Sequence, residues 1–127
     1  MRRRWILVLS VAVLLAGLSC RSSARRTSIP SEAQTALDAA VDDIDKGRYD
    51  KLYQEAADEW RAQSSLEDSK AKLQKLHDSL GKARTRTLNS AREEQTSTAP
   101  IAGHSVTVFY QTTFERGTGM EAYVLVE

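Results

Sequence analysis

The feature that most constrains the fold is a change in hydrophobic period near Gly81. Before this glycine, apolar residues recur every three or four positions, which places them along one side of an α-helix. In residues 104–127, apolar and polar residues alternate, as they do in a strand with one buried face. Helices followed by strands are typical of an α+β domain, with the helices on one face of an antiparallel sheet.

About three helices are expected before Gly81. Ser31 with Gln34 three residues later forms a capping-box pattern, which predicts that the first helix begins at this serine. Gly47 suits the left-handed conformation that ends many helices. The apolar spacing predicts helices over residues 31–46, 49–60 and 66–80.

A β-hairpin is expected at the carboxyl end of the chain. Residues 104–115 alternate in polarity, "RGTG" at 116–119 reads as the turn, and residues 120–127 alternate again. One face of the first strand should carry the following residues: Val106, Val108, Tyr110, Thr112 and Phe114. Residues 83–94 are a further expected strand, and residues 95–103 are the loop after it.

The first 20 residues have the composition of an export signal. Three arginines precede an apolar run from Trp5 to Leu18. This run is shorter than the roughly 20 residues that a membrane-spanning helix needs. We therefore expect a helical signal segment that is removed on export.

The signal ends at Cys20, the only cysteine of the chain. Ser19 before this cysteine suits the cleavage site of a bacterial lipoprotein, in which the thiol receives a diacylglyceryl group. Residues 1–20 are therefore interpreted as a lipoprotein signal, and the lipid would anchor the chain in the membrane. Because Arg21 rather than aspartate follows the cysteine, the outer membrane is favoured in a Gram-negative cell. The alternative is cleavage after Ala24, which would give a soluble secreted or periplasmic domain.

The polar segment 21–30 reads as a flexible tether, and residues 31–127 read as a single domain of unknown function. Without the three leader arginines, 15 basic residues face 17 acidic ones, so nucleic acid is not an expected partner. One cysteine excludes an intrachain disulfide framework and a multi-cysteine zinc site.

Charge is divided unevenly along the domain. Residues 31–60 hold nine acidic and three basic side chains, whereas residues 70–92 hold seven basic and one acidic. The two parts could attract each other across the fold. Alternatively, an anion-binding site is formed by four basic residues: Lys82, Arg84, Arg86 and Arg92. Arg84, Arg86 and Arg92 are expected on one face of the strand over residues 83–94.

Few residues point to catalysis. His77 is expected on an exposed helix flank and His104 at a strand start, and no metal-ligand spacing links them. No metal, cofactor or catalytic residue is therefore assigned. Between Ser105 and Phe114 and between Met120 and Val126, Glu121 is the only acidic or basic residue, and an exposed strand position explains it best.

Three stretches resemble a bacterial family of exported domains of unknown function, the one numbered 4019. They are "VDDIDKGRYDKLYQEAADEW", "LGKARTRTL" and "VFYQTTFERGTGMEAYVLV", and the resemblance covers Ala36 to Glu127. Its recognisable points are nine residues: Asp45, Gly47, Tyr49, Leu80, Gly81, Arg86, Tyr110, Phe114 and Glu121. The family is similar to cone-shaped folds of the nuclear-transport-factor-two or cystatin-like type, which hold small ligands or peptides. It carries no agreed catalytic set.

The resemblance also implies a departure. The final strand that is usual in the family is absent before Glu127, so the sheet is expected to present an unpaired edge. Such an edge would accept an envelope protein or a second copy of the chain. The expected function is that of a membrane-anchored, periplasm-facing lipoprotein that binds a small ligand or a protein, or supports an envelope assembly. The alternative is a cone-fold enzyme of unknown reaction.

Overall fold

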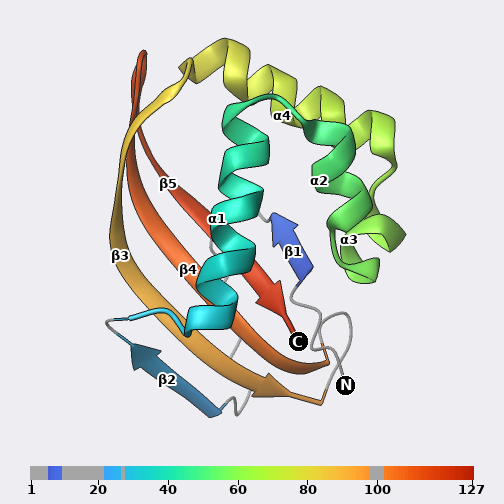
Figure 1. Ribbon diagram of the computed structural model, residues 1–127, viewed down its shortest axis with the longest axis vertical. Helices are drawn as coiled ribbons and strands as arrows, with labels where there is room; N and C mark the ends of the chain where they lie inside the picture. The colour runs from blue at the N-terminus through green and yellow to red at the C-terminus, as the bar shows by residue number, and fades with distance from the viewer. Residues whose placement is uncertain (1–5, 10–21, 27, 98–101) are drawn as a thin grey trace.

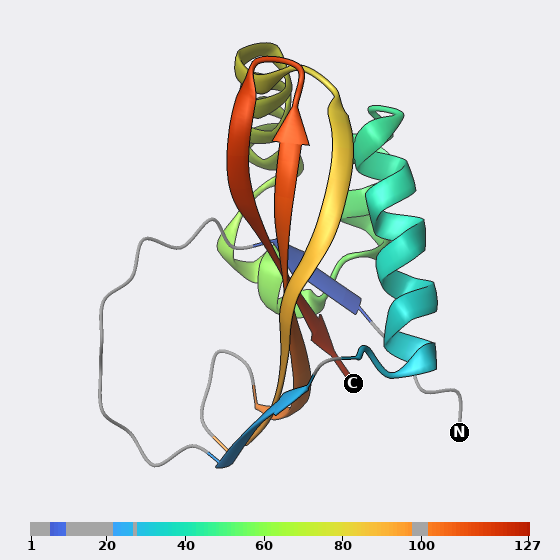
Figure 2. The same ribbon diagram turned by 90° about the vertical axis from the view of Figure 1, so that its left-hand side faces the viewer.

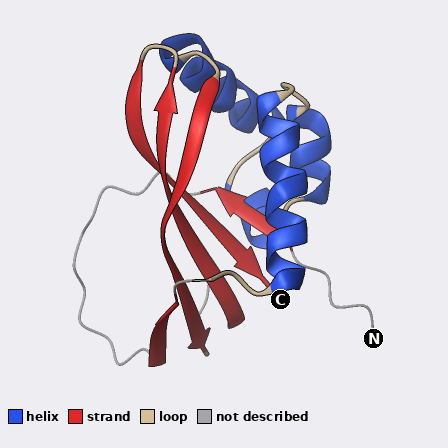
Figure 3. Ribbon diagram, turned by 60° about the vertical axis from the view of Figure 1, so that its left-hand side comes forward, coloured by secondary structure: helices blue, strands red, loops and turns tan. Residues whose placement is uncertain are grey.

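A computed structural model describes residues 6–9, 22–26, 28–97 and 102–127. Figure 1 shows helices gathered on one side of a curved antiparallel sheet, and Figure 3 shows the two layers from another side. The helices in the described part of the chain are α1 Ser31–Asp45, α2 Tyr49–Glu55, α3 Asp58–Gln63 and α4 Leu66–Leu80. The expected α+β class is confirmed.

The sheet has the strand order β1-β5-β4-β3-β2 and is antiparallel throughout. Its strands are β1 Ile6–Leu9, β2 Ser22–Arg26, β3 Ala83–Thr96, β4 Gly103–Phe114 and β5 Gly117–Val126. On β4, Val106, Val108 and Thr112 are fully buried, while Phe109 and Gln111 between them are not. The predicted face of this strand is therefore confirmed.

The core lies between α1 and the inner face of β4 and β5. Its fully buried side chains include Leu37 from α1, Val106 and Val108 from β4, and Tyr123 and Leu125 from β5. Apolar residues on α1 recur at the expected three- and four-residue spacing, because only one stripe of this helix faces the sheet. Figure 2 looks onto the strands from the side opposite to the helical layer, with α4 behind them.

The expected capping box at the start of α1 is wrong. Pro30 is the last non-helical residue, with φ −54° and ψ 140°, so Ser31 already lies in the first turn and its side chain caps nothing. Gln34 instead donates from its side chain to Asp38, 2.6 Å away. The other end of α1 is as expected, since Gly47 adopts a left-handed φ of +68°.

The expected helix over residues 49–60 is broken into α2 and α3. Ala56 adopts an extended conformation, and both Ala56 and Ala57 are buried at the break. New hydrogen bonds satisfy the groups that a continuous helix would have paired, because Arg61 donates to the Gln54 carbonyl oxygen at 2.8 Å. Trp60 is thereby buried and its indole N–H donates to the Ser69 hydroxyl at 3.2 Å.

The hairpin turn lies two residues earlier than expected. Phe114 pairs with Gly117, so the loop consists of Glu115 and Arg116 rather than residues 116–119. Both loop residues are held from outside the hairpin: Glu115 N–H donates to the Lys82 carbonyl, and Arg116 N–H donates to the Leu80 carbonyl. The end of α4 therefore sets the turn, which is why the local glycines do not mark it.

Parts of the expected leader and tether pair with the sheet. Ile6–Leu9 form β1 along β5, and Ser22–Arg26 form β2 along β3. The leader was expected to be helical, but its described residues are extended, since the edge of β5 offers backbone hydrogen bonds to this β-branched and aliphatic segment. Cys20 lies outside the described residues. No helix in the described part of the chain is long and apolar enough to cross a membrane.

Candidate functional site

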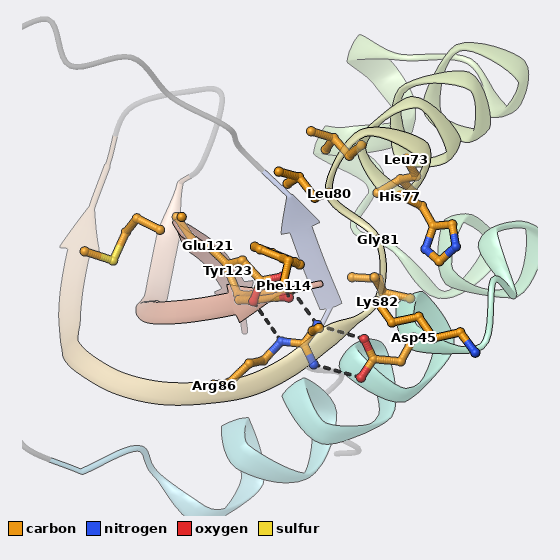
Figure 4. A pocket seen from close by; sticks show the side chains of 16 residues that line it. Asp45, Leu73, His77, Leu80, Gly81, Lys82, Arg86, Phe114, Glu121 and Tyr123 are labelled. Carbon is orange, nitrogen blue, oxygen red and sulfur yellow. Dashed lines mark hydrogen bonds and ion pairs between the residues drawn. The ribbon is translucent and has the colours of Figure 1, made fainter. Parts of the chain in front are cut away.

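A cavity of about 210 Å³ lies between α4, the end of α1 and the hairpin of β4 and β5. Three leucines of α4, Leu73, Leu76 and Leu80, form its helical wall, as Figure 4 shows in part. The remaining apolar lining residues are Ile44, Ala83, Phe114, Met120 and Ala122, with Gly81 and Gly119 between them. We call this cavity the hairpin pocket.

The hairpin pocket collects the exposed apolar side chains of the domain. Among the described residues, Leu76 (39% exposed) and Met120 (53% exposed) are the large hydrophobic residues that remain open to solvent. Both line this pocket, one from α4 and the other from β5. The two exposed apolar groups therefore converge on one concave site and are not scattered over the surface.

The floor of the pocket is an ion network centred on Arg86. Its guanidinium group donates to both carboxylate oxygens of Asp45, at 2.7 and 2.8 Å. It also donates from Nε to Glu121, at 2.7 Å. Figure 4 shows the guanidinium group lying between these two carboxylates. Asp45 belongs to α1, Arg86 to β3 and Glu121 to β5, so the network joins the helical layer to two strands.

Two hydroxyl groups complete the coordination of Glu121. Thr112 donates to Oε2, and Tyr123 donates to Oε1 at 3.0 Å. No buried side-chain nitrogen or oxygen in the described part of the chain lacks a hydrogen-bond partner. The carboxylate therefore binds neighbouring side chains through both oxygens and offers little to an incoming ligand.

The network also moves the pKa values of its members. Burial lowers the pKa of Arg86, but its hydrogen bonds to Asp45 and Glu121 outweigh this effect, so the pKa is raised and the guanidinium stays charged. Burial, aided by the negative charge of Glu121, raises the pKa of the Tyr123 phenol far above its usual value. At neutral pH, the tyrosine is therefore a hydrogen-bond donor to the carboxylate.

The β4–β5 turn fixes the position of α4 against the pocket. The Arg116 side chain donates to three carbonyl oxygens at the end of this helix: His77, Asp78 and Ser79. Glu115 accepts a hydrogen bond from the backbone N–H of Lys82 at 3.0 Å, which lowers the pKa of its carboxyl group. The helix wall and the hairpin wall are thus linked at one end of the pocket.

The four basic residues predicted as an anion site do not line one cavity. Arg86 lines the hairpin pocket together with Lys82, and it also lines a second cavity, between α1 and β3, together with Arg84. Arg86 is bound by two carboxylates, and Arg92 is exposed farther along β3. The expectation that Arg84, Arg86 and Arg92 share one face is wrong.

The reason is irregular pairing of β3. Its register to β4 shifts between Ala83 and Thr85 and again between Leu88 and Ser90. Each shift inserts one residue and reverses which side chains face the helices. Ala91 is consequently buried against the core, and the neighbouring Arg92 is exposed.

The acidic and basic parts of the chain do attract each other across the fold. Lys70 of α4 binds Asp50 of α2 at 2.9 Å, in addition to the pairing of Arg86 with Asp45. Asp42 of α1 also binds Lys46, the residue directly after this helix, with an N–O distance of 2.7 Å. Ion pairs between the acidic residues of 31–60 and the basic residues of 70–92 therefore form in the folded domain.

Neither histidine is placed as a lone surface residue. His77 was expected on an exposed flank but is half-buried and lines the hairpin pocket. His104 lies between two carboxylates, with Nε2 at 2.6 Å from Glu93 and Nδ1 at 2.8 Å from Glu127. Within the described ranges, no group of three or more potential ligands is arranged to hold a metal ion.

Sequence reasoning missed that Asp45 and Glu121 form one site with Arg86. Glu121 was expected to be exposed, but its side chain is only 18% exposed because it faces the helices beside Arg86. The available signal was indirect. Asp45, Arg86 and Glu121 are all among the residues that carry the family resemblance, and these three meet in space.

The fold and the site define a small α+β domain with a one-sided helical layer and an apolar pocket over a closed ion network. A family model described as "Protein of unknown function (DUF4019)" matches residues 36–127, and the chain belongs to this family. No curated protein and no solved structure matches the chain. The likeness to a nuclear-transport-factor-two or cystatin-like cone stays a prediction.

Proposed function

We propose that this domain is a binding module whose hairpin pocket holds a small, uncharged apolar ligand or the apolar part of a larger one. The observation that carries this proposal is the convergence of Leu76 and Met120, both exposed, on one cavity of about 210 Å³. Pockets for drug-sized ligands enclose about 300–1,000 Å³, so the ligand buried here is small.

The ion network favours an uncharged ligand. Arg86 faces two carboxylates, so an anion would have to displace Asp45 or Glu121 from it. A cation would meet Arg86, and Lys82 also lines the pocket. Transfer of a charged group from water into this site costs free energy, and Asp45 and Glu121 already occupy the guanidinium of Arg86. Because both oxygens of Glu121 already bind neighbouring side chains, the site favours ligand binding over acid–base catalysis by this residue.

Two fluorescent probes with the same ring system test this proposal. N-Phenyl-1-naphthylamine is uncharged, whereas 8-anilino-1-naphthalenesulfonate carries a sulfonate. The chain is used with Cys20→Ser, so that no acyl group competes for the probe. We expect the uncharged probe to bind with an increase in fluorescence, and the sulfonate to bind about tenfold more weakly or worse.

A matched pair of variants locates the binding. Ala83→Leu places a larger side chain in the pocket, whereas Ala39→Leu makes the same change at an exposed position of α1. Ala83→Leu should weaken binding of the uncharged probe about tenfold while Ala39→Leu leaves it unchanged. Thermal unfolding of both variants checks that they fold. Equal binding to the two folded variants, or tighter binding of the sulfonate, would contradict the proposal.

We also propose that the domain is exported and anchored in the bacterial envelope through a lipid on Cys20, facing the periplasm. The leader composition supports this, and so does β2, because cleavage after Ala24 would divide this strand whereas cleavage before Cys20 leaves Ser22–Arg26 intact. The mass of the mature amino terminus tests it. A diacylglyceryl-modified Cys20 that is lost in Cys20→Ser is the expected result, and an unmodified start beyond residue 20 would overturn it.

A further inference from the structure

The outer edge of β5 is unusually open to a further strand. β1 covers Tyr123–Val126, and no strand within the described residues pairs with the outer edge of Gly117–Ala122. Natural sheet edges are commonly protected by lysine, proline or bulges. β5 contains no lysine or proline and pairs with β4 without a register shift. Its one charged residue, Glu121, is bound to Arg86 on the inner side.

The strand β1, which covers the other part of this edge at Tyr123–Val126, belongs to the proposed export leader. Ile6, Leu7, Val8 and Leu9 pair in antiparallel register with Val126, Leu125, Val124 and Tyr123. β1 also contacts α1 and α3, and Figure 1 shows it beside β5 and between these two helices. The seat of β1 is therefore a slot with the β5 edge on one side and helices on the other.

We infer that this slot is a strand-accepting site, and that its occupant after removal of the leader is an extended, uncharged apolar segment of another protein. This inference rests on the export proposed above. The occupant runs antiparallel to β5 over at least four residues, as β1 does. Backbone hydrogen bonds to the edge would supply affinity, and apolar side chains would supply selectivity.

A second copy of the chain fits the slot less well. A second copy could offer the edge of its own β5, which lies beside α1 in the same fold, or that of β2, which carries Arg25 and Arg26 and so is not an uncharged apolar segment. Pairing of two β5 edges would bring the helices of both copies toward the same slot. A lone extended segment requires only the space that the four residues of β1 now fill.

The direction of pairing links the slot to the hairpin pocket. From Ile6 to Leu9, β1 runs along β5 from Val126 toward Tyr123. Residues added at the carboxyl end of a bound segment would therefore run along Ala122–Gly119, past the pocket and the exposed Met120. Residues added at the amino end would pass beyond Val126. Carboxyl-terminal extensions should strengthen binding more than amino-terminal ones of the same composition.

The test uses a fluorescein-labelled peptide that contains Ile-Leu-Val-Leu between lysines, and measures its anisotropy with protein purified from cells that express the full chain. The mass of the protein shows independently whether the leader has been removed. Processed protein should bind the peptide, whereas unprocessed protein should bind it about tenfold more weakly, because β1 competes within the chain. Equal binding to both forms would overturn the inference.

Two isomeric peptides provide the matched control. One carries N-methyl groups on the first and third apolar residues and the other on the second and fourth. In a strand, alternate N–H groups face the neighbouring strand, so one isomer should bind like the parent peptide and the other about tenfold more weakly or not at all. Equal affinities of the two isomers would contradict strand addition.

Two further outcomes separate the possible failures. If the leader is retained in cells, the export proposal is wrong. The slot is then tested in the full chain with a double variant, Leu7→Pro and Val8→Pro. The two prolines remove two adjacent N–H groups of β1 and so weaken its pairing with β5. Peptide binding by this variant still supports the slot. A processed protein that forms a stable dimer and ignores the peptide would overturn the peptide occupant in favour of a second copy.

Discussion

Asp43 and Asp45 stand two positions apart on α1 and serve different parts of the molecule. Asp43 is 1% exposed and binds Arg48 and Lys51, which are close in sequence, at 2.7 and 2.9 Å. Asp45 is half-exposed and binds Arg86, which is 41 positions away. The first carboxylate stabilises the turn between α1 and α2, whereas the second holds α1 against the sheet and forms part of the pocket floor.

The difference shows that burial alone does not identify which carboxylate lines the pocket. Asp43 is the more buried of the two, but its partners are exposed and local, so its cluster needs no other part of the fold. Asp45 is less buried and connects three elements through Arg86. Substitutions that separate the two clusters therefore test whether the long-range one supports the pocket.

The largest effect is expected for Arg86→Met. Removal of the guanidinium leaves Glu121, which is 18% exposed, without its cation, and loss of one partner from a buried pair costs about 3 kcal/mol of unfolding free energy. Arg84→Met, at an exposed position of the same strand, should change stability by less than about 0.5 kcal/mol. Urea denaturation measures both. Similar losses for the two variants would show that the network contributes little.

Asp43→Asn should lower the free energy of unfolding by about 2 kcal/mol, less than Arg86→Met does. The loss is smaller because Arg48 and Lys51 are exposed and regain water when their partner becomes neutral. Asp45→Asn should cost about 1 kcal/mol, since Asp45 is already half in solvent. Binding of N-phenyl-1-naphthylamine should weaken only in Asp45→Asn. Urea denaturation and probe titration of the same samples measure stability and binding separately. Loss of binding in Asp43→Asn alone would show that Asp43, and not Asp45, supports the pocket.

The smallest effect at neutral pH is expected for Tyr123→Phe, which loses one hydrogen bond to Glu121, or about 1 kcal/mol. Because the folded-state pKa of Tyr123 is raised above the unfolded value of about 10, its contribution is complete below pH 10 and falls as the pH rises further. The stability difference between wild type and variant should therefore shrink above pH 10. Denaturation from pH 8 to 11 measures it, and a constant difference would show that the phenol does not titrate differently on folding.

Much of the fold follows from local pattern. The apolar spacing of α1 and the alternation of β4 each require one buried side, and the structure buries that side. The apolar spacing of α4 predicts the helix correctly, but Leu76 on its apolar side stays 39% exposed. The break between α2 and α3 was not predictable in this way, because Ala56 and Ala57 are good helix formers. Their break is stabilised by contacts of Trp60 and Arg61 with residues from neighbouring segments.

The candidate site was less predictable than the fold. Arg86 was predicted as one of four cations for an anion, and the structure pairs it with two carboxylates instead. Neither Asp45 nor Glu121 has a local pattern that distinguishes it from a solvated acidic residue. The shifts of register in β3 also reverse the faces of the arginines, and no turn residue in the sequence marks these shifts.

The sequence by itself determined that helices precede strands between residues 31 and 127, which side of α1 and α4 is apolar, and the alternation of the hairpin, because these depend on periods of a few residues. Only the tertiary structure decided where the hairpin turns and which charges meet. The turn is held by Leu80 and Lys82, and the pocket floor joins residues 35 and 41 positions apart. Such contacts form only after helices and sheet have packed, so short-range pattern carries no record of them.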